Sequence, residues 1–274
     1  MWDNSAILDN PVTSGFKADK LKFVRTIESM RNIEMNKKIV DTSAYRELFT
    51  AGNLMGPNSA LLLGELLNRY PSDFDKTSII LDLGCGKGLT SLVIHKETNA
   101  IVYANDLWIS QEENGKRFAD WGLSEVLIPT CEDANHLTLK KDFFDALISI
   151  DSYHYFAGKT HFFEEKILPH IKSGGYALIA IPGIKNEFSG RQNELLGTWL
   201  KEEAYMFKSP DEWKRIIGDS DQISSVEIWE MDCFEQAWAD WLDTGNDYAL
   251  NDKLYYESII HPYTNFVGIM VKKK

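Results

Sequence analysis

A glycine-rich turn at Gly84–Gly88 constrains the fold of this 274-residue chain more than any other feature. The turn has glycine at positions 84, 86 and 88, follows the apolar run Ser78–Leu83 and precedes the helix-forming segment Leu89–Glu97. Glycine has no Cβ atom, so the backbone can turn tightly there and approach a ligand. The free N–H groups of the helix that follows add positive dipole character. Together these features predict a ligand-binding unit of strand, turn and helix.

The same alternation of apolar runs and helical stretches continues toward the C-terminus. Six further segments have the apolar pattern of strands: residues 100–106, 126–133, 144–151, 174–183, 223–231 and 264–274. Helical patterns separate several of them, at residues 110–122, 160–171 and 233–242. Near-continuous apolar strands that alternate with helices form parallel sheets covered on both faces. We therefore expect an α/β fold with a doubly wound, mostly parallel, seven-stranded sheet.

Two segments lie outside this alternation. Residues 1–75 contain no strong strand pattern; residues 20–34 and 58–70 have a helical one, and Gly56-Pro57-Asn58 is typical of a helix start. Residues 184–218 form a polar, helix-prone insertion, in which Ser209-Pro210-Asp211-Glu212 has the pattern of a helix N-terminus. We expect a helical extension or lid over residues 1–75 and a core over residues 76–274, with a lid insertion at about 184–218.

Composition and charge narrow the classes of function. The formal net charge is −12 at pH 7, with 44% hydrophobic and 26% charged residues. Phosphate backbones and anionic lipids repel an acidic chain at long range. The longest apolar runs, at 146–150 and 177–181, are far shorter than the ~20 residues of a membrane-spanning helix. We expect no nucleic-acid partner and no stable membrane association.

The cysteines and histidines carry no recognisable framework. The three cysteines show no C-x-x-C spacing, and the six histidines show no H-x-H or H-E-x-x-H grouping. We therefore expect neither a disulfide framework nor a metal site. The acidic N-terminal segment does not have the pattern of a signal peptide. These observations predict a cytoplasmic protein.

The spacing of the glycines separates the nucleotide-binding classes. A dinucleotide fingerprint needs glycine at position 89, where the chain has leucine, and a P-loop needs serine or threonine after Lys87, where it has glycine. Asp106 follows the second predicted strand, 22 residues after Gly84, where a carboxylate can accept hydrogen bonds from a ribose. The D-x-G-x-G-x-G pattern of Asp82–Gly88 resembles motif I of the class I S-adenosylmethionine (AdoMet)-dependent methyltransferases.

The resemblance extends over about residues 78–183 and the closing strands, and it implies a Rossmann-like fold. It implies AdoMet as cofactor and S-adenosylhomocysteine as product. Asp106 matches the acid that holds the ribose, and Glu132-Asp133-Ala134 matches the segment that contacts adenine. The cofactor-binding residues implied by the resemblance are Asp82, Gly84, Cys85, Gly86, Gly88, Asp106, Leu107, Glu132, Asp133, Ala134 and Ile150.

The segment Asp151–Phe156 follows the fourth predicted strand, where this family places its reaction centre. Imidazole is a base near neutral pH, and aromatic ring faces can lie against a sulfonium cation. Tyr153, His154 and Tyr155 are therefore the candidate catalytic residues, and whether His154 or Tyr153 acts as a base stays open. The alternative interpretation is that the aromatic residues belong to the core and that His154 is inert.

The acceptor is constrained only by class. After the fourth predicted strand the chain lacks the Asn/Asp-Pro-Pro-aromatic tetrapeptide of amino-methylating DNA and protein enzymes. Together with the acidic charge, this favours a small-molecule acceptor that is methylated on carbon, oxygen or nitrogen. The outline is similar to the branch of ubiquinone-biosynthesis, sterol and cyclopropane-fatty-acid-type enzymes. The chain departs from the cyclopropane synthases, however, because Lys87 replaces their usual tryptophan.

Other interpretations stay open from the sequence. The same crevice could serve a non-catalytic AdoMet-binding module that regulates a partner, or an NAD-dependent oxidoreductase. The turn Asn53–Asn58 either closes on the methionine end of the cofactor or only starts a helix. The simplest interpretation of four aromatic residues is that they pack in the core and the lid: Trp229, Phe234, Trp238 and Trp241. One or two of them could instead line a substrate pocket or a dimer interface, so a homodimer also stays open.

Overall fold

The computed structural model describes residues 40–70 and 74–274. Residues 40–274 form one compact unit. The helix predicted at residues 20–34 and the N-terminal part of the predicted extension lie outside the described residues.

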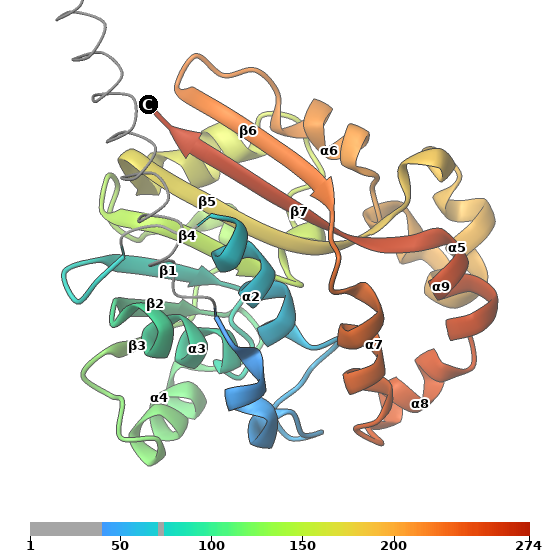
Figure 1. Ribbon diagram of the computed structural model, residues 1–274. Coiled ribbons are helices and arrows are strands. Elements are labelled where there is room, and N and C mark those ends of the chain that lie inside the picture. The colour runs from blue at the N-terminus through green and yellow to red at the C-terminus, as the bar shows by residue number, and fades with distance from the viewer. Residues whose placement is uncertain (1–39, 71–73) are drawn as a thin grey trace, which may run out of the picture. The chain divides into compact units, whose positions relative to one another are not determined.

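A seven-stranded sheet organises this unit (Figure 1). The strand order is β3-β2-β1-β4-β5-β7-β6; β1 to β5 pair in parallel, and β7 runs antiparallel to both β5 and β6. The fold prediction of a doubly wound, mostly parallel seven-stranded sheet is confirmed. The strands are β1 (Ile79–Leu83), β2 (Ile101–Asn105), β3 (Leu127–Thr130), β4 (Phe144–Ile150), β5 (Ile171–Ile184), β6 (Ile223–Glu230) and β7 (Thr264–Lys273).

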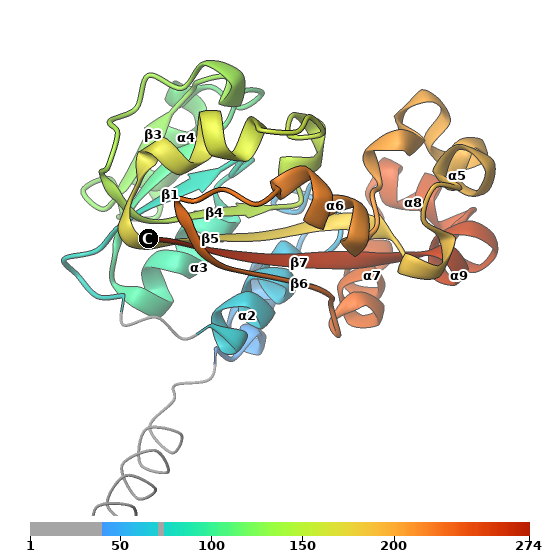
Figure 2. The ribbon, with the colours of Figure 1, turned by 90° about the horizontal axis from the view of Figure 1, so that it is seen from above.

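Helices cover both faces of the sheet (Figure 2). On one face, α2 (Ser59–Arg69), α3 (Leu89–Thr98) and α7 (Phe234–Leu242) bury their apolar sides in one hydrophobic cluster with alternate strand residues such as Ile80 and Ile148. On the other face, α6 (Pro210–Ile217) and residues 163–170 pack on the remaining residues of the same strands. Because both sheet faces are covered, the central strands are apolar at nearly every position.

Several predicted boundaries agree with the structure because local capping sets them. Asn58 caps α2 through its side chain, which accepts from the Ala60 N–H, and Ser209 caps α6 in a reciprocal capping box with Glu212. Ser110 and Glu113 form the same motif at α4 (Gln111–Asp120). Each side chain satisfies an N–H group that has no partner inside the helix.

The predicted helix at 160–171 is wrong in form. A π turn at Phe163–Ile167 and a 3-10 turn at Leu168–His170 replace it, and β5 begins at Ile171. Pro169 removes a backbone N–H and disfavours helical geometry for the residue before it. Sequence patterns also missed the helical segment after α7, which contains α8 (Asp247–Lys253), the π turn Tyr256–Ile260 and α9 (His261–Tyr263).

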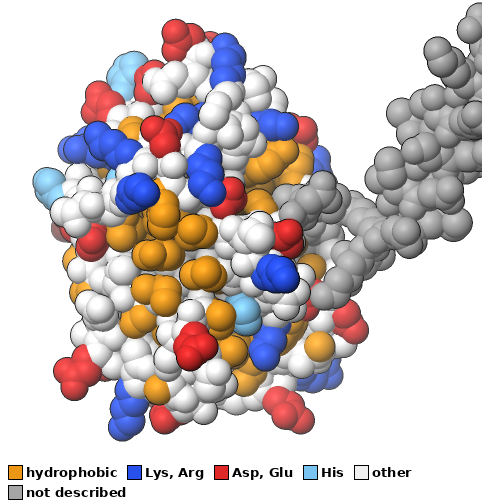
Figure 3. Space-filling model, turned by 90° about the vertical axis from the view of Figure 1, so that its left-hand side faces the viewer, with side chains coloured by type: hydrophobic (Ala, Val, Ile, Leu, Met, Phe, Trp, Pro, Cys, Tyr) orange, Lys and Arg blue, Asp and Glu red, His pale blue; other side chains and the backbone are white. Residues whose placement is uncertain are grey.

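The carboxyl ends of the parallel strands all face one end of the molecule. α7 and α8, together with α5 (Gln192–Leu200), gather beyond that end (Figure 1). At the opposite end, acidic and basic side chains are interspersed around a group of hydrophobic ones (Figure 3). Ligands of open α/β sheets bind at the carboxyl ends of the strands. This end therefore holds the candidate site.

Candidate active site

The turn between β1 and α3 depends on its glycines for geometry. Gly84, Gly86 and Gly88 have φ values of 79°, 53° and 80°, in the left-handed region that side chains disfavour. A Cβ on Gly84 would lie 1.8 Å from the Ser152 hydroxyl oxygen, and one on Gly88 would lie 2.5 Å from the Phe118 ring. Gly84 thus lets the turn approach the segment after β4, while Gly88 lets α3 approach α4.

Asp82 supports this turn from beneath the cavity. Its side chain is fully buried, and its Oδ2 atom accepts hydrogen bonds from the hydroxyls of Thr90 and Ser91, each at 2.6 Å. Burial raises the pKa of Asp82 to about 6, although the two hydroxyls act in the opposite direction. Asp82 lines neither cavity described below, so it positions the first turn of α3 instead of meeting a ligand.

Asp106 ties the turn to the end of β2. Its Oδ2 accepts from the Gly86 N–H at 2.8 Å, and its Oδ1 accepts from the N–H groups of Trp108 and Ile109 at 2.8 and 2.9 Å. An ionised carboxylate has about four acceptor positions. Asp106 therefore keeps acceptor capacity for a ligand hydroxyl while its orientation is held by three backbone groups.

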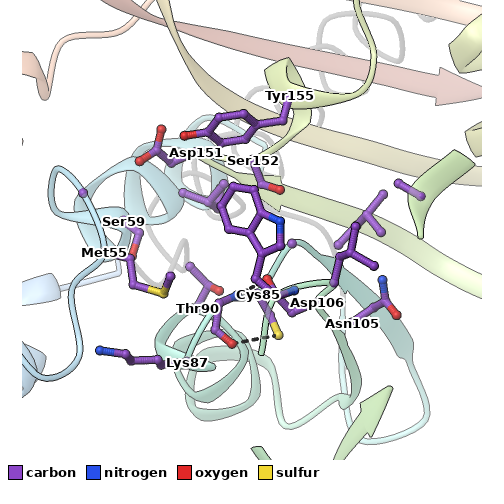
Figure 4. Close-up of a pocket in the computed structure, with 18 of the residues that line it drawn as sticks. Met55, Ser59, Cys85, Lys87, Thr90, Asn105, Asp106, Asp151, Ser152 and Tyr155 are labelled. Atoms are coloured by element: carbon purple, nitrogen blue, oxygen red, sulfur yellow. Dashed lines mark hydrogen bonds between the residues drawn. The ribbon is translucent and has the colours of Figure 1, made fainter. Parts of the chain in front are cut away.

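A first cavity of about 320 Å³ lies between this turn and the ends of β2, β3 and β4. Figure 4 shows Cys85, Thr90 and Asp106 on one side of it and Asp151, Ser152 and Tyr155 on the other. Gly88 packs on Phe118 and, like Asp82, does not line it. The other predicted cofactor residues do: Gly84, Cys85, Gly86, Asp106, Leu107, Glu132, Asp133, Ala134 and Ile150.

The β3 side of the cavity is held by its own acids. Asp133 caps the short turn Ala134–His136 and accepts from Asn135 and from the ring of His136. The backbone and side-chain hydrogen bonds of Asn135, followed by that of His136, lower the pKa of Asp133 to about 2. Glu132 accepts from the N–H and hydroxyl of Thr138. Both carboxylates shape the loop and still line the cavity.

These residues fit a nucleoside-bearing cofactor such as AdoMet. Gly84 and Gly86 line the cavity without side chains of their own, Asp106 keeps acceptor capacity, and Leu107, Ile150 and Phe156 provide apolar lining. Small-molecule sites commonly combine apolar walls with a few fixed polar groups. The sulfonium that AdoMet would bring is cationic, and the acids that line the cavity match its charge.

A second cavity of about 570 Å³ adjoins the first at the carboxyl end of the sheet. The two cavities share seven lining residues: Met55, Gly56, Pro57, Lys87, Trp108, Asp151 and Tyr155. The sequence left open whether the turn Asn53–Asn58 only starts a helix or also reaches the ligand site. In the structure this turn precedes α2 and also lines both cavities. Within the predicted lid insertion, residues 199–207 supply lining side chains, whereas α6 packs on the sheet face.

Asp151 stands where the two cavities meet. It follows β4 with a φ of 53°, and within the described part of the chain its carboxylate accepts no hydrogen bond. Burial, together with the nearby charge of Asp252, raises the pKa of Asp151 to about 7. A Cβ on Gly56 would lie 2.5 Å from its Oδ2 atom, so glycine there makes room for the carboxylate. Sequence reasoning named this segment but not this residue, although an acid at a strand end is the signal for it.

The three predicted catalytic residues lie in different surroundings. Tyr155 lines both cavities, and its ring contacts that of Trp108 edge-on, with centroids 5.3 Å apart. His154 lines the second cavity only; burial lowers its pKa to about 3, and its Nδ1 atom has no partner within the described residues. An imidazole with so low a pKa is neutral and a weak base at pH 7.

Tyr153 corrects the sequence prediction. Its side chain is fully buried against Phe156, Phe162 and Trp213 and lines neither cavity. Among the residues that the structure describes, its hydroxyl has no hydrogen-bond partner. Tyr153 is therefore a core aromatic residue and not a candidate for the reaction centre.

Several other features bear on the chemistry. Burial and the nearby acids Asp82 and Asp106 raise the pKa of the Cys85 thiol, which argues against Cys85 as a nucleophile.

Within residues 40–70 and 74–274, no cluster of three His, Cys, Asp or Glu side chains could hold a metal ion. In the same residues no helix combines the length and apolarity needed to cross a membrane.

Comparison with known proteins identifies this part of the chain. Residues 81–179, from β1 into β5, match the family model of a methyltransferase domain. The chain carries a methyltransferase domain. The domain includes the glycine turn, Asp106, Glu132 and Asp133, which carry the sequence resemblance, and also the segment after β4. The resemblance to methyltransferases predicted from the sequence is confirmed over these residues.

Solved structures share the fold at low sequence identity. The geranyl diphosphate C-methyltransferase of Streptomyces coelicolor A3(2) superposes with a TM-score of 0.62 at 13% identity, over 79% of this chain and 78% of that one. The phosphoethanolamine N-methyltransferase 2 of Haemonchus contortus gives 0.65 at 18% identity, over 89% of this chain and 59% of that one. The MccD protein gives 0.61 at 15% identity, over 80% of this chain and 100% of that one. No curated protein sequence matches the chain significantly.

Proposed function

We propose that this protein transfers a methyl group from AdoMet to a small-molecule acceptor. The observation that carries the proposal is the pair of adjoining cavities, one at the glycine turn of the methyltransferase domain and one beside it, with Asp151 and Tyr155 lining both. Two reactants must meet for direct methyl transfer, and holding them in line supplies much of the rate enhancement. The structural neighbours described with AdoMet or S-adenosylhomocysteine act on small molecules, which supports this class of acceptor.

The first cavity would hold the cofactor. Asp106 would accept from the ribose hydroxyls, the Gly84–Gly86 backbone would approach the nucleoside and methionine portions, and Asp133 would orient the adenine. Met55 and Lys87, which line both cavities, would close on the methionine end. AdoMet supplies an activated methyl group when bound, so the protein mainly aligns and desolvates the reactants.

The test is calorimetric titration with S-adenosylhomocysteine, followed by turnover with AdoMet and a metabolite extract. Asp106→Asn should weaken S-adenosylhomocysteine binding by about 10–100-fold, because hydrogen bonds to a charged group contribute about 1.5–3 kcal/mol each. Asp120→Asn, an exposed aspartate at the end of α4, is the matched control and should bind as the unchanged protein does. Unchanged affinity in Asp106→Asn would refute the ribose role.

The rival functions give different results in the same experiments. Binding of S-adenosylhomocysteine with no methylated product would favour a non-catalytic module. Tight NAD binding without any response to S-adenosylhomocysteine would favour an oxidoreductase.

The cysteines and the net charge support the proposed compartment and partners. Cys85, Cys131 and Cys233 are unpaired, as suits a reducing cytoplasm. The charge of −12 argues against nucleic acid as a partner. A homodimer stays a prediction.

A further inference from the structure

The second cavity has a distinctive lining. Its walls carry the aromatic rings of Tyr155, Trp199, Trp238, Trp241 and Tyr248, each from a residue that lines this cavity. Aromatic ring faces carry partial negative charge and attract cations, most strongly in tryptophan. The same lining holds charged groups, which a purely apolar acceptor would leave without partners.

The charged groups of the same lining are mostly acidic. They are Asp151, Glu203 and Asp252 against Lys87, and His154 is neutral. The Lys87 ammonium donates to the Gly52 carbonyl at 2.7 Å, so part of its hydrogen-bonding capacity is used at the rim. This balance favours a positively charged ligand.

Two of the three acids are left without a partner, and the third is fixed. Asp252 accepts from the indole N–H groups of Trp199 and Trp241 at 2.9 and 3.0 Å, which joins both rings to one carboxylate. Within the described residues, Glu203 and Asp151 accept no hydrogen bond. The Trp238 indole N–H is buried and also lacks a partner there. Glu203 is exposed, whereas Asp151 is partly buried. A partly buried carboxylate without a partner is costly, and a cationic ligand would offset that cost at Asp151.

We propose that the second cavity binds a methyl acceptor carrying an aliphatic amine, held as a cation among the aromatic rings, and that Asp151 takes the proton which the amine must lose. The proposal rests on the proposed function and names its substrate class. Asp151 is placed for this because it lines both cavities, whereas Glu203 and Asp252 line only the second. Glu203 and Asp252 would attract the cation, and Asp151 would meet the nitrogen beside the methyl group.

The step balances without a further reactant. The ammonium transfers one proton to the Asp151 carboxylate, which exposes the lone pair of the nitrogen. A bond then forms between nitrogen and the methyl carbon while the bond between carbon and sulfur breaks, and its electron pair stays on sulfur as the thioether of S-adenosylhomocysteine. The proton on Asp151 passes to water, and the methylated amine leaves as a cation.

The raised pKa of Asp151, about 7, supports this use, because a general base works best when its pKa lies near the operating pH. Burial is the main cause of that shift, and Asp252 adds to it. The other titratable groups facing the cavity are Glu203, Lys87, His154, Tyr155 and Tyr248.

The experiment uses a charged probe and its neutral isostere. Choline and 3,3-dimethyl-1-butanol have the same shape and differ in one charge. With the full chain saturated with S-adenosylhomocysteine, calorimetry and tryptophan fluorescence should show choline binding at least tenfold more tightly than the alcohol. Saturation with S-adenosylhomocysteine is measured first, so its absence would be a failure of the proposed function and not of this inference.

Variants locate the charge that matters. Asp151→Asn and Glu203→Gln should each weaken choline binding about tenfold and leave binding of the neutral alcohol unchanged. Glu202→Gln is the matched control, because Glu202 is the exposed neighbour of Glu203 and lines neither cavity. Thermal unfolding confirms that each variant is folded.

Product analysis then decides the reaction. With AdoMet and a metabolite extract, the new methyl group should appear on nitrogen, and Asp151→Asn should lower kcat at least tenfold near pH 7. Equal binding of choline and the alcohol, or choline affinity unchanged in both acid variants, would overturn the proposal. So would methyl transfer found only on carbon or oxygen.

Discussion

The two cavities share part of their lining but differ in whether their polar side chains have hydrogen-bond partners. In the first, polar groups are satisfied before any ligand arrives: Asp106 accepts three backbone N–H groups, and Asp133 caps its own turn. In the second, the Nδ1 atom of His154 and the indole N–H of Trp238 are buried without a partner among the described residues, and the partly buried Asp151 carboxylate accepts no hydrogen bond from them. The polar groups of the first cavity are therefore held in fixed orientations, whereas the second cavity has unpaired polar groups to which a ligand could bind.

The difference follows from how each cavity is assembled along the chain. The turn, Asp106 and the Glu132–Ala134 segment each follow a parallel strand, so the sheet register brings them together. The second cavity instead takes its rings from α5, α7 and α8, three helices that no strand register positions. Cofactor binding can thus be shared by proteins with different acceptors, because substrate specificity lies in the separately built part.

The largest expected effect tests the rigidity of the first cavity. Gly84→Ala would place a Cβ 1.8 Å from the Ser152 hydroxyl oxygen at a φ of 79°. Backbone strain and overpacking together should lower the free energy of unfolding by roughly 2–5 kcal/mol and weaken S-adenosylhomocysteine binding over about 100-fold. Urea unfolding and calorimetry measure both.

The matched control for that change is Gly122→Ala. Gly122 has a similar φ of 70°, but a Cβ there would meet no atom of the described residues within 4 Å. Only the strain of about 1 kcal/mol should appear, with ligand affinity unchanged. If the two variants lose stability equally, close approach to Ser152 is not what Gly84 provides.

A smaller effect tests the unpaired charge of the second cavity. The pKa of Asp151 is about 7 when folded and near 3.8 when unfolded, so the folded state binds more protons between these values. Its stability should therefore fall as pH rises from about 4 to 7. Asp151→Asn removes this penalty and should be more stable than the unchanged protein by roughly 2–4 kcal/mol at pH 8, with little difference near pH 4.

Denaturant unfolding across that pH range is the measurement. Asp219→Asn, an exposed aspartate after α6, is the control and should change stability at neither pH. A gain for Asp151→Asn that does not depend on pH would mean that the Asp151 charge is not penalised in the folded state.

The smallest effect separates two neighbouring tyrosines. Tyr153→Phe removes a buried hydroxyl that has no partner in the described part of the chain. Stability should therefore stay level or rise by about 1 kcal/mol, and turnover should stay within about twofold. Tyr155→Phe changes the phenol that lines both cavities and should lower turnover with little change in stability. Thermal unfolding measures the stability of both variants, and methyl-transfer rates measure their turnover. A loss of turnover in Tyr153→Phe alone would show that Tyr153, and not Tyr155, acts in the reaction centre.

The sequence allowed much of the first cavity to be predicted and little of the second. Glycine spacing and strand ends identified Gly84, Gly86 and Asp106, because local backbone geometry and parallel register follow from short patterns. The same reasoning could not separate Tyr153 from Tyr155. Both lie in one short turn, Tyr153–Tyr155, and only packing against Trp213 shows that the first is core.

By itself, then, the sequence determined the seven-stranded fold, the methyltransferase domain and the place of the cofactor turn. These depend on apolar periodicity, capping residues and glycines, whose effects extend over a few neighbouring residues. Only the tertiary structure decided that Asp151 stands between two cavities and that Asp252 joins Trp199 to Trp241 across 53 and 11 residues of chain. Burial and charge at those positions depend on which distant segments contact one another, and a local sequence pattern does not predict such contacts.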